Sequence, residues 1–105
     1  MPRIDALKGF LEEDPNDTFS RYALAMEYAK LERYADTIRE FETIVRNDPK
    51  YVAVYYQLGK AYEHDGRFDD AQKAYRDGLE VAAAAGEERA RNELQEALDM
   101  LTGTA

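Results

Sequence analysis

A chain of 105 residues suits a single domain, and a domain of this size can bury enough apolar surface to fold without disulfides or metals. The sequence has no cysteine, which excludes disulfides, cysteine-based zinc sites and thiol catalysis. Its net charge of −8, from 14 basic and 22 acidic residues, makes nucleic acid and anionic membranes poor partners.

Apolar residues recur at helical spacing along the whole chain, and sustained two-residue alternation is absent. In the first half of the chain this spacing predicts helices over residues 3–13, about 18–31 and about 34–46. The first helix must end before Pro15, because proline disfavours helical backbone in the residue ahead of it. Asp17 or Thr18 can cap the second helix, and Pro49 follows the third.

The second half of the chain continues the pattern, with helices over about residues 52–63, from 68 or 69 to 85, and over 87–101. Gly66 lies in the turn after the first of these, where a helix C-cap favours positive φ. Gly86 closes the next helix, and residues 102–105 are expected to form a frayed tail. Loops of about three to five residues make successive helices antiparallel, which fits either a bundle or a solenoid.

An internal repeat decides between these two architectures. The period is 34 residues, the distance from Pro15 to Pro49. At this shift similar residues coincide along both units: Tyr22 with Tyr56, Leu24 with Leu58, Tyr28 with Tyr62, Arg33 with Arg67, Tyr34 with Phe68, Asp36 with Asp70 and Phe41 with Tyr75. Two helices per unit of this length are typical of a solenoid, so the sequence predicts an all-α, short α-solenoid of antiparallel helix pairs.

The repeated residues resemble the pattern of the tetratricopeptide repeat family. The second unit carries it at Tyr55, Leu58, Gly59, Tyr62, Gly66, Phe68, Ala71, Tyr75 and Gly78. The first unit carries it at Leu24, Ala25, Tyr28, Tyr34, Phe41, Ile44 and Pro49. Three residues depart from it: Arg21 stands where the family often has tryptophan, Thr37 replaces a small alanine, and Ala83 stands where the second unit would repeat the proline.

The resemblance implies one right-handed, TPR-like domain over residues 1–105. Its parts would be a half-repeat helix at 3–13, repeats at 18–51 and 52–85, a capping helix at 87–101 and a tail at 102–105. Small residues at Ala25 and Gly59 would let paired helices approach closely. Four aromatic residues would fill the space between adjacent helices: Tyr28, Phe41, Tyr62 and Tyr75.

The resemblance also implies a binding face, because in this family the first helix of each pair lines a concave groove. That face would consist of Phe19, Tyr22, Met26 and Lys30 from the first pair, with Ala53, Tyr56, Gln57, Lys60 and His64 from the second. Aromatic and methionine side chains offer contact area, and the two lysines can meet carboxylates of a partner. Alternatively, Phe19, Tyr22 and Met26 pack against a terminal helix. The inner positions do not resemble the family's clamp for a C-terminal carboxylate.

We therefore expect a module that binds a peptide or helical segment of another protein, rather than an enzyme. The single histidine, His64, has no serine or cysteine nucleophile in a recognisable motif beside it, and no metal or cofactor is implied. The alternative is a homo-oligomerisation module, a possible homodimer that pairs through its end helices by Leu94, Leu98 and Leu101. No uncharged stretch is long enough to cross a bilayer and no signal peptide is evident, so a cytoplasmic protein is expected.

Overall fold

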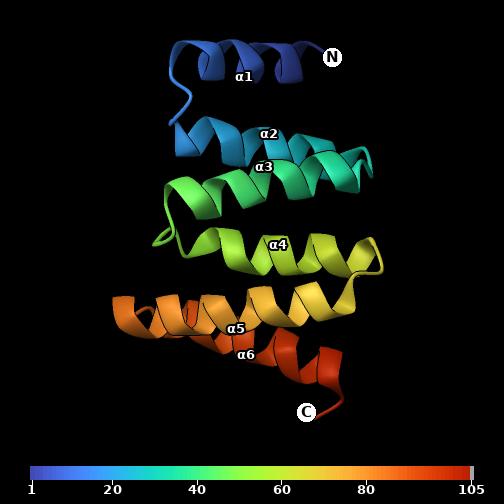
Figure 1. Cartoon of the computed structure of the whole chain (residues 1–105), viewed down its shortest axis with the longest axis vertical. Helices are drawn as coiled ribbons and strands as arrows, with labels where there is room; N and C mark the ends of the chain where they lie inside the picture. The colour runs from blue at the N-terminus through green and yellow to red at the C-terminus, as the bar shows by residue number, and fades with distance from the viewer. Residues whose placement is uncertain (105) are drawn as a thin grey trace.

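The computed structural model describes residues 1–104, and six helices contain most of them (Figure 1). The helices are α1 (Pro2–Glu13), α2 (Thr18–Lys30), α3 (Tyr34–Asn47), α4 (Ala53–His64), α5 (Phe68–Ala85) and α6 (Glu88–Thr102). No strand occurs among the described residues, which confirms the predicted all-α class. The predicted helix bounds differ from these by a single residue wherever they differ.

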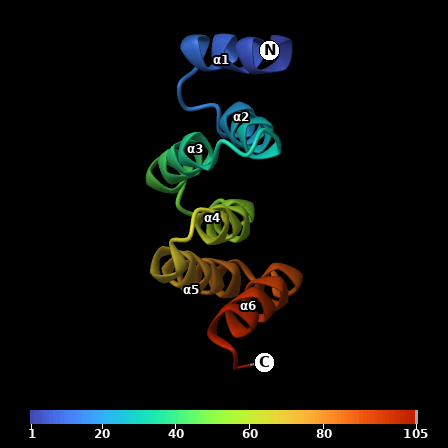
Figure 2. The same ribbon diagram turned by 90° about the vertical axis from the view of Figure 1, so that its right-hand side faces the viewer.

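The helices form an elongated stack, with principal extents of 42 × 29 × 19 Å. Each helix packs chiefly on the next one in the chain, and α6 also contacts α4. Figure 2 shows that α2, α4 and α6 lie on one side of the stack, with α3 and α5 on the other. This zigzag is the helical repeat arrangement that the sequence period predicts. It places equivalent side chains of α2 and α4 on the same side of the stack.

Two apolar clusters hold the stack together. The main core runs from α2 to α6 and includes Phe41, Tyr55, Tyr75 and Leu94. A smaller cluster joins α1 to α2 through five buried residues: Ile4, Leu7, Leu11, Leu24 and Tyr28. Burial of the predicted core aromatics is confirmed at Tyr28, Phe41, Tyr62 and Tyr75, and Tyr55 is buried with them.

The turns repeat from one hairpin to the next as closely as the helices do. The Arg33 guanidinium lies 4.8 Å from the centre of the Tyr28 ring, and Arg67 lies 4.8 Å from that of Tyr62. Both arginines also form ion pairs three residues ahead, with Asp36 and Asp70 respectively. These matching contacts fix both hairpins in the same phase.

Helix ends follow local sequence signals. The Asp17 carboxylate caps α2, accepting hydrogen bonds from the Ser20 hydroxyl at 2.6 Å and the Ser20 amide at 3.1 Å, and these bonds lower the pKa of Asp17. The prediction of a frayed tail at 102–105 is wrong for the described part. Thr102 belongs to α6, and Gly103, at φ +74°, turns the chain so that the Thr104 amide bonds to the Asp99 carbonyl at 3.0 Å. Ala105 lies outside the described residues.

One turn residue is strained, and this gives a first prediction. Glu32 has φ +57°, the left-handed conformation that Gly66 adopts at φ +75° in the equivalent turn. A side chain costs roughly 1 kcal/mol in this conformation, so Glu32→Gly should raise the free energy of unfolding by up to about 1 kcal/mol. Chemical denaturation measures the change. Glu32→Ala is the matched control, because it removes the carboxylate and keeps the strained Cβ; an equal gain from alanine would contradict the explanation.

Candidate functional site

The α2 part of the predicted face is open. Phe19, Tyr22 and Met26 follow one another at helical spacing on the side of α2 that faces away from α1. Phe19 is 78% exposed, so it does not pack against a terminal helix. Tyr22 and Met26 are half-buried against the main core instead. For these three residues the alternative of packing against a terminal helix is therefore wrong.

The α4 part repeats this geometry with a charged neighbour. The Tyr22 ring packs on Phe41 with centroids 5.5 Å apart, and the Tyr56 ring packs on Tyr75 at 6.3 Å. The two pairs have similar interplanar angles of 52° and 47°. The Lys60 ammonium lies 5.5 Å from the centre of the Tyr56 ring. Tyr22 and Tyr56 thus occupy equivalent places on neighbouring helices.

The two parts of the face meet where the Gln57 side chain of α4 lies beside the Tyr22 phenol of α2. Burial, followed by the neighbouring Tyr51 phenol, raises the pKa of Tyr22. Tyr51, which precedes α4, was not among the residues predicted for the face, and its ring lies 5.8 Å from that of Tyr22. Its only sequence signal was an aromatic residue close behind Pro49 in the turn. The wall presented by α2 and α4 is therefore continuous and aromatic at this end.

Lys30 and His64 stand at the C-terminal ends of α2 and α4. The Lys30 ammonium forms an ion pair with Glu27 at 2.9 Å and remains largely exposed. The His64 ring stacks on Tyr34, with centroids 5.0 Å apart and planes 7° from parallel. Exposed groups of this kind suit the polar rim of a binding surface rather than its centre.

Arg21, where the family often has tryptophan, has a structural role that the sequence did not reveal. Its guanidinium forms a largely shielded ion pair with Glu40 of α3 at 2.7 Å. It also donates to the Pro15 carbonyl at 2.9 Å. Tyr55, the equivalent residue of α4, donates its hydroxyl to the Pro49 carbonyl. Both side chains fasten a helix to the loop before it, so Arg21 belongs to the scaffold and not to the binding face.

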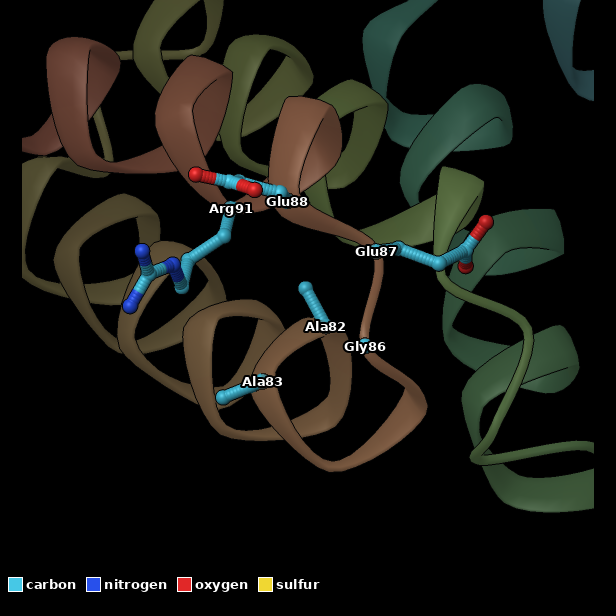
Figure 3. Close-up of a pocket in the computed structure, with 6 residues that line it drawn as sticks. All are labelled: Ala82, Ala83, Gly86, Glu87, Glu88 and Arg91. Atoms are coloured by element: carbon cyan, nitrogen blue, oxygen red, sulfur yellow. The ribbon is translucent and has the colours of Figure 1, made fainter.

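Several surface hollows lie away from this face. One of about 290 Å³ sits in the α5–α6 corner and is lined by Ala82, Ala83, Gly86, Glu87, Glu88 and Arg91 (Figure 3). A larger one, of about 520 Å³, is lined by Pro49, Lys50, Glu80, Val81, Ala84 and Ala85. Among residues 1–104 no group of three or more histidines and carboxylates could hold a metal ion. None of the six helices is both long and apolar enough to span a bilayer.

The structure corrects the surface expected for self-association. Leu94 and Leu98 are buried in the main core, and Leu101 is half-buried against it. They form the inner face of α6, which packs on α5 and α4. The amphipathic pattern of an end helix indicates that its apolar stripe is covered but not by what. Here the core of the same chain covers it. These leucines are therefore not available for pairing with another molecule.

The stacked hairpins, with α2 and α4 presenting equivalent residues on one side, define a helical repeat protein. A family model described as tetratricopeptide repeat matches residues 28–88. The match covers more than half of the chain, which therefore belongs to the tetratricopeptide repeat family. Domains of this family are protein–protein interaction modules without catalytic activity.

Known relatives agree with this assignment. A tetratricopeptide repeat domain protein from Salinibacter ruber, solved by NMR, is 43% identical with a TM-score of 0.81, over 88% of this chain and 93% of that one. A TPR repeat-containing protein of Pseudomonas aeruginosa is 29% identical over 91 residues, which are 87% of each chain. The TPR2B domain of yeast Sti1, solved in complex with pHsp70, has a TM-score of 0.88 at 16% identity, over 97% of this chain and 82% of that one. That last likeness concerns the fold alone.

Proposed function

We propose that this protein binds a peptide or a helical segment of another protein along the wall formed by α2 and α4. The contact residues would be Phe19, Tyr22, Met26, Lys30, Tyr56, Gln57, Lys60 and His64. The observation that carries the proposal is the 78% exposure of Phe19, at one end of the continuous Tyr22–Tyr51 aromatic surface. A large apolar side chain left in water beside other rings marks a surface that gains free energy when a partner covers it.

The rest of the face fits this role. Tyr22 and Tyr56 are held by packing on Phe41 and Tyr75, so little conformational entropy is lost when they contact a partner. Lys60 and Gln57 supply polar groups beside the rings, which can fix the register of a bound segment. The yeast TPR2B domain, whose fold is similar, was solved in complex with pHsp70, which supports the use of such a stack for binding another protein.

Phe19→Ala is the sharpest test, because the exposed ring can be removed with little effect on the core. Peptides of 12 to 20 residues selected from a random display library against the wild type would serve as probes. We expect Phe19→Ala and Lys60→Glu each to weaken binding of the selected peptides about tenfold or more, as loss of hot-spot contacts does. Isothermal titration calorimetry measures the affinity.

Arg89→Ala is the matched control, since Arg89 is exposed on the outer side of α6, far along the chain from the face. Its affinity for the same peptides should equal that of the wild type, and circular dichroism should show all three variants folded. Amide chemical-shift changes on titration should map to α2 and α4. Equal affinities for wild type and both face variants, or shifts confined to α3 and α5, would remove this face from consideration.

A further inference from the structure

Helix α1 carries a second exposed stripe, which is not part of the proposed binding face on α2 and α4. Its inner face, with Ile4, Leu7 and Leu11, is buried against α2. Its outer face presents Arg3, Ala6, Phe10 and Glu13, spaced so that all four share one side of the helix. Phe10 is 54% exposed. Figure 1 shows α1 at one end of the stack, where it packs on α2.

The order of residues along this stripe makes it complementary to itself. When two copies of α1 pair antiparallel about Lys8, each residue meets one at the same distance on the other side of that centre. Arg3 then faces Glu13 of the second copy, and the small Ala6 faces the large Phe10. Each contact occurs twice, as the symmetry of an isologous pair requires. Opposite charges lie at the ends of the stripe, and a small residue lies opposite a large apolar one near its middle.

We infer that α1 is a self-association surface, through which two copies of this chain pair head to head. The charges are placed for it: Arg3 and Glu13 lie about 15 Å apart along the helix in each copy, so both ion pairs form together. Among residues 1–104, Glu13 takes part in no ion pair, and the Arg3 side chain, which forms an ion pair with Glu27 of α2 at 3.3 Å, remains 65% exposed.

The opposite end of the stack does not offer α1 an equally good partner. The outer face of α6 carries Arg89, Asn92, Glu93 and Glu96 along most of its length, and the exposed Met100 lies near its C-terminal end. Head-to-tail stacking of α1 on the middle of α6 would set Phe10 against charged and amide groups, which is costly when their water is removed. The second copy's α1 is the occupant that matches both the charge order and the apolar centre.

This interface consists of one helix face per copy, which is smaller than the roughly 800 Å² per partner of standard complexes. We therefore expect a weak, concentration-dependent dimer, with a dissociation constant of about ten micromolar or more. The proposed binding face belongs to α2 and α4, so it shares no residue with this interface on α1. The dimer would therefore carry two copies of the proposed binding face.

Sedimentation equilibrium over about 10 µM to 1 mM tests the inference at concentrations suited to weak interfaces. The wild type should dimerise, and Phe10→Asp should raise the dissociation constant at least about tenfold. Arg3→Glu and Glu13→Arg, each alone, should also weaken self-association, because like charges then face each other. An equimolar mixture of these two variants should form a heterodimer, since every charged position in it regains an opposite partner.

The mixture separates this geometry from a loss of folding or from pairing elsewhere on the surface. Phe10 is largely exposed, and the Arg3–Glu27 ion pair at the surface contributes at most about 1 kcal/mol, so circular dichroism and thermal unfolding of the variants should match the wild type within about 1 kcal/mol. A wild type that stays monomeric at the highest concentration would overturn the inference. So would a dimer that Phe10→Asp leaves intact, or two charge variants that fail to pair when mixed.

Discussion

Gly59→Ala is expected to destabilise the protein by about 3 kcal/mol, although alanine is the better helix former. A Cβ at this position would lie 2.2 Å from Cε1 of Tyr75 and 2.6 Å from Cδ1 and Cζ. The Tyr75 ring cannot give way at small cost. It is fully buried, packs on Tyr56, and donates its hydroxyl to the Glu63 carboxylate. Chemical denaturation of both proteins gives the difference directly.

Gly9→Ala is the matched control for this prediction, because Gly9 also lies inside a helix and an added Cβ meets nothing within 4 Å. It should stabilise the protein by about 0.5 to 1 kcal/mol through the unfolded chain alone. The two substitutions should therefore have opposite signs. If Gly59→Ala were neutral or stabilising, the close approach of α4 and α5 would not be what holds a glycine at this position.

The first hairpin shows why the same rule has two outcomes. Ala25 takes the place of Gly59 there, and Phe41 takes that of Tyr75, with both residues buried. A small residue opposite a ring recurs in both hairpins. Only in the second hairpin is the contact so close that the small residue must lack a Cβ. The 34-residue pattern therefore predicted the helices and the core aromatics. How closely two side chains pack depends on the distance between the paired helices, which the pattern does not give.

Other features could not be predicted from spacing, because they join residues in different surroundings. The Arg21–Glu40 ion pair occupies a position where an aromatic was expected, and its partner lies on the next helix. Tyr51 joins the binding face from a turn, which helical periodicity does not describe. The tail was expected to fray because chain ends commonly do, whereas Thr102 continues α6 and Gly103 caps it.

The sequence could predict which residues belong to the candidate face, but not which neighbours each side chain contacts. Its residues could be named because the 34-residue period alone implies that α2 and α4 present equivalent positions on the same side. What each side chain meets depends on neighbours outside the pattern: His64 stacks on Tyr34, and Lys60 lies over Tyr56. The strongest signal on the face, the exposure of Phe19, became visible only when the positions of the terminal helices were known.

The end helix α6 was the point of greatest ambiguity, and its inner face gives the second large prediction. Leu94 is 1% exposed, and its two methyl carbons lie 3.1 Å from where a Cβ of Gly78 would stand. Leu94→Ala removes those carbons between α5 and α6 and leaves a cavity that the helices can only partly close. Buried leucine-to-alanine changes cost about 2 to 5 kcal/mol, and we expect about 3 kcal/mol here.

Met100→Ala on the same helix separates loss of packing from loss of helix propensity. Met100 is 70% exposed, so its truncation should change the free energy of unfolding by less than about 0.5 kcal/mol. Both variants should be compared by denaturation at a concentration well below that of self-association. If α6 were a loosely attached helix waiting for a partner, Leu94→Ala would be as mild as Met100→Ala. A large loss confined to Leu94 would mean that α6 closes the core of this chain, which leaves α1 as the end of the stack free to meet another molecule.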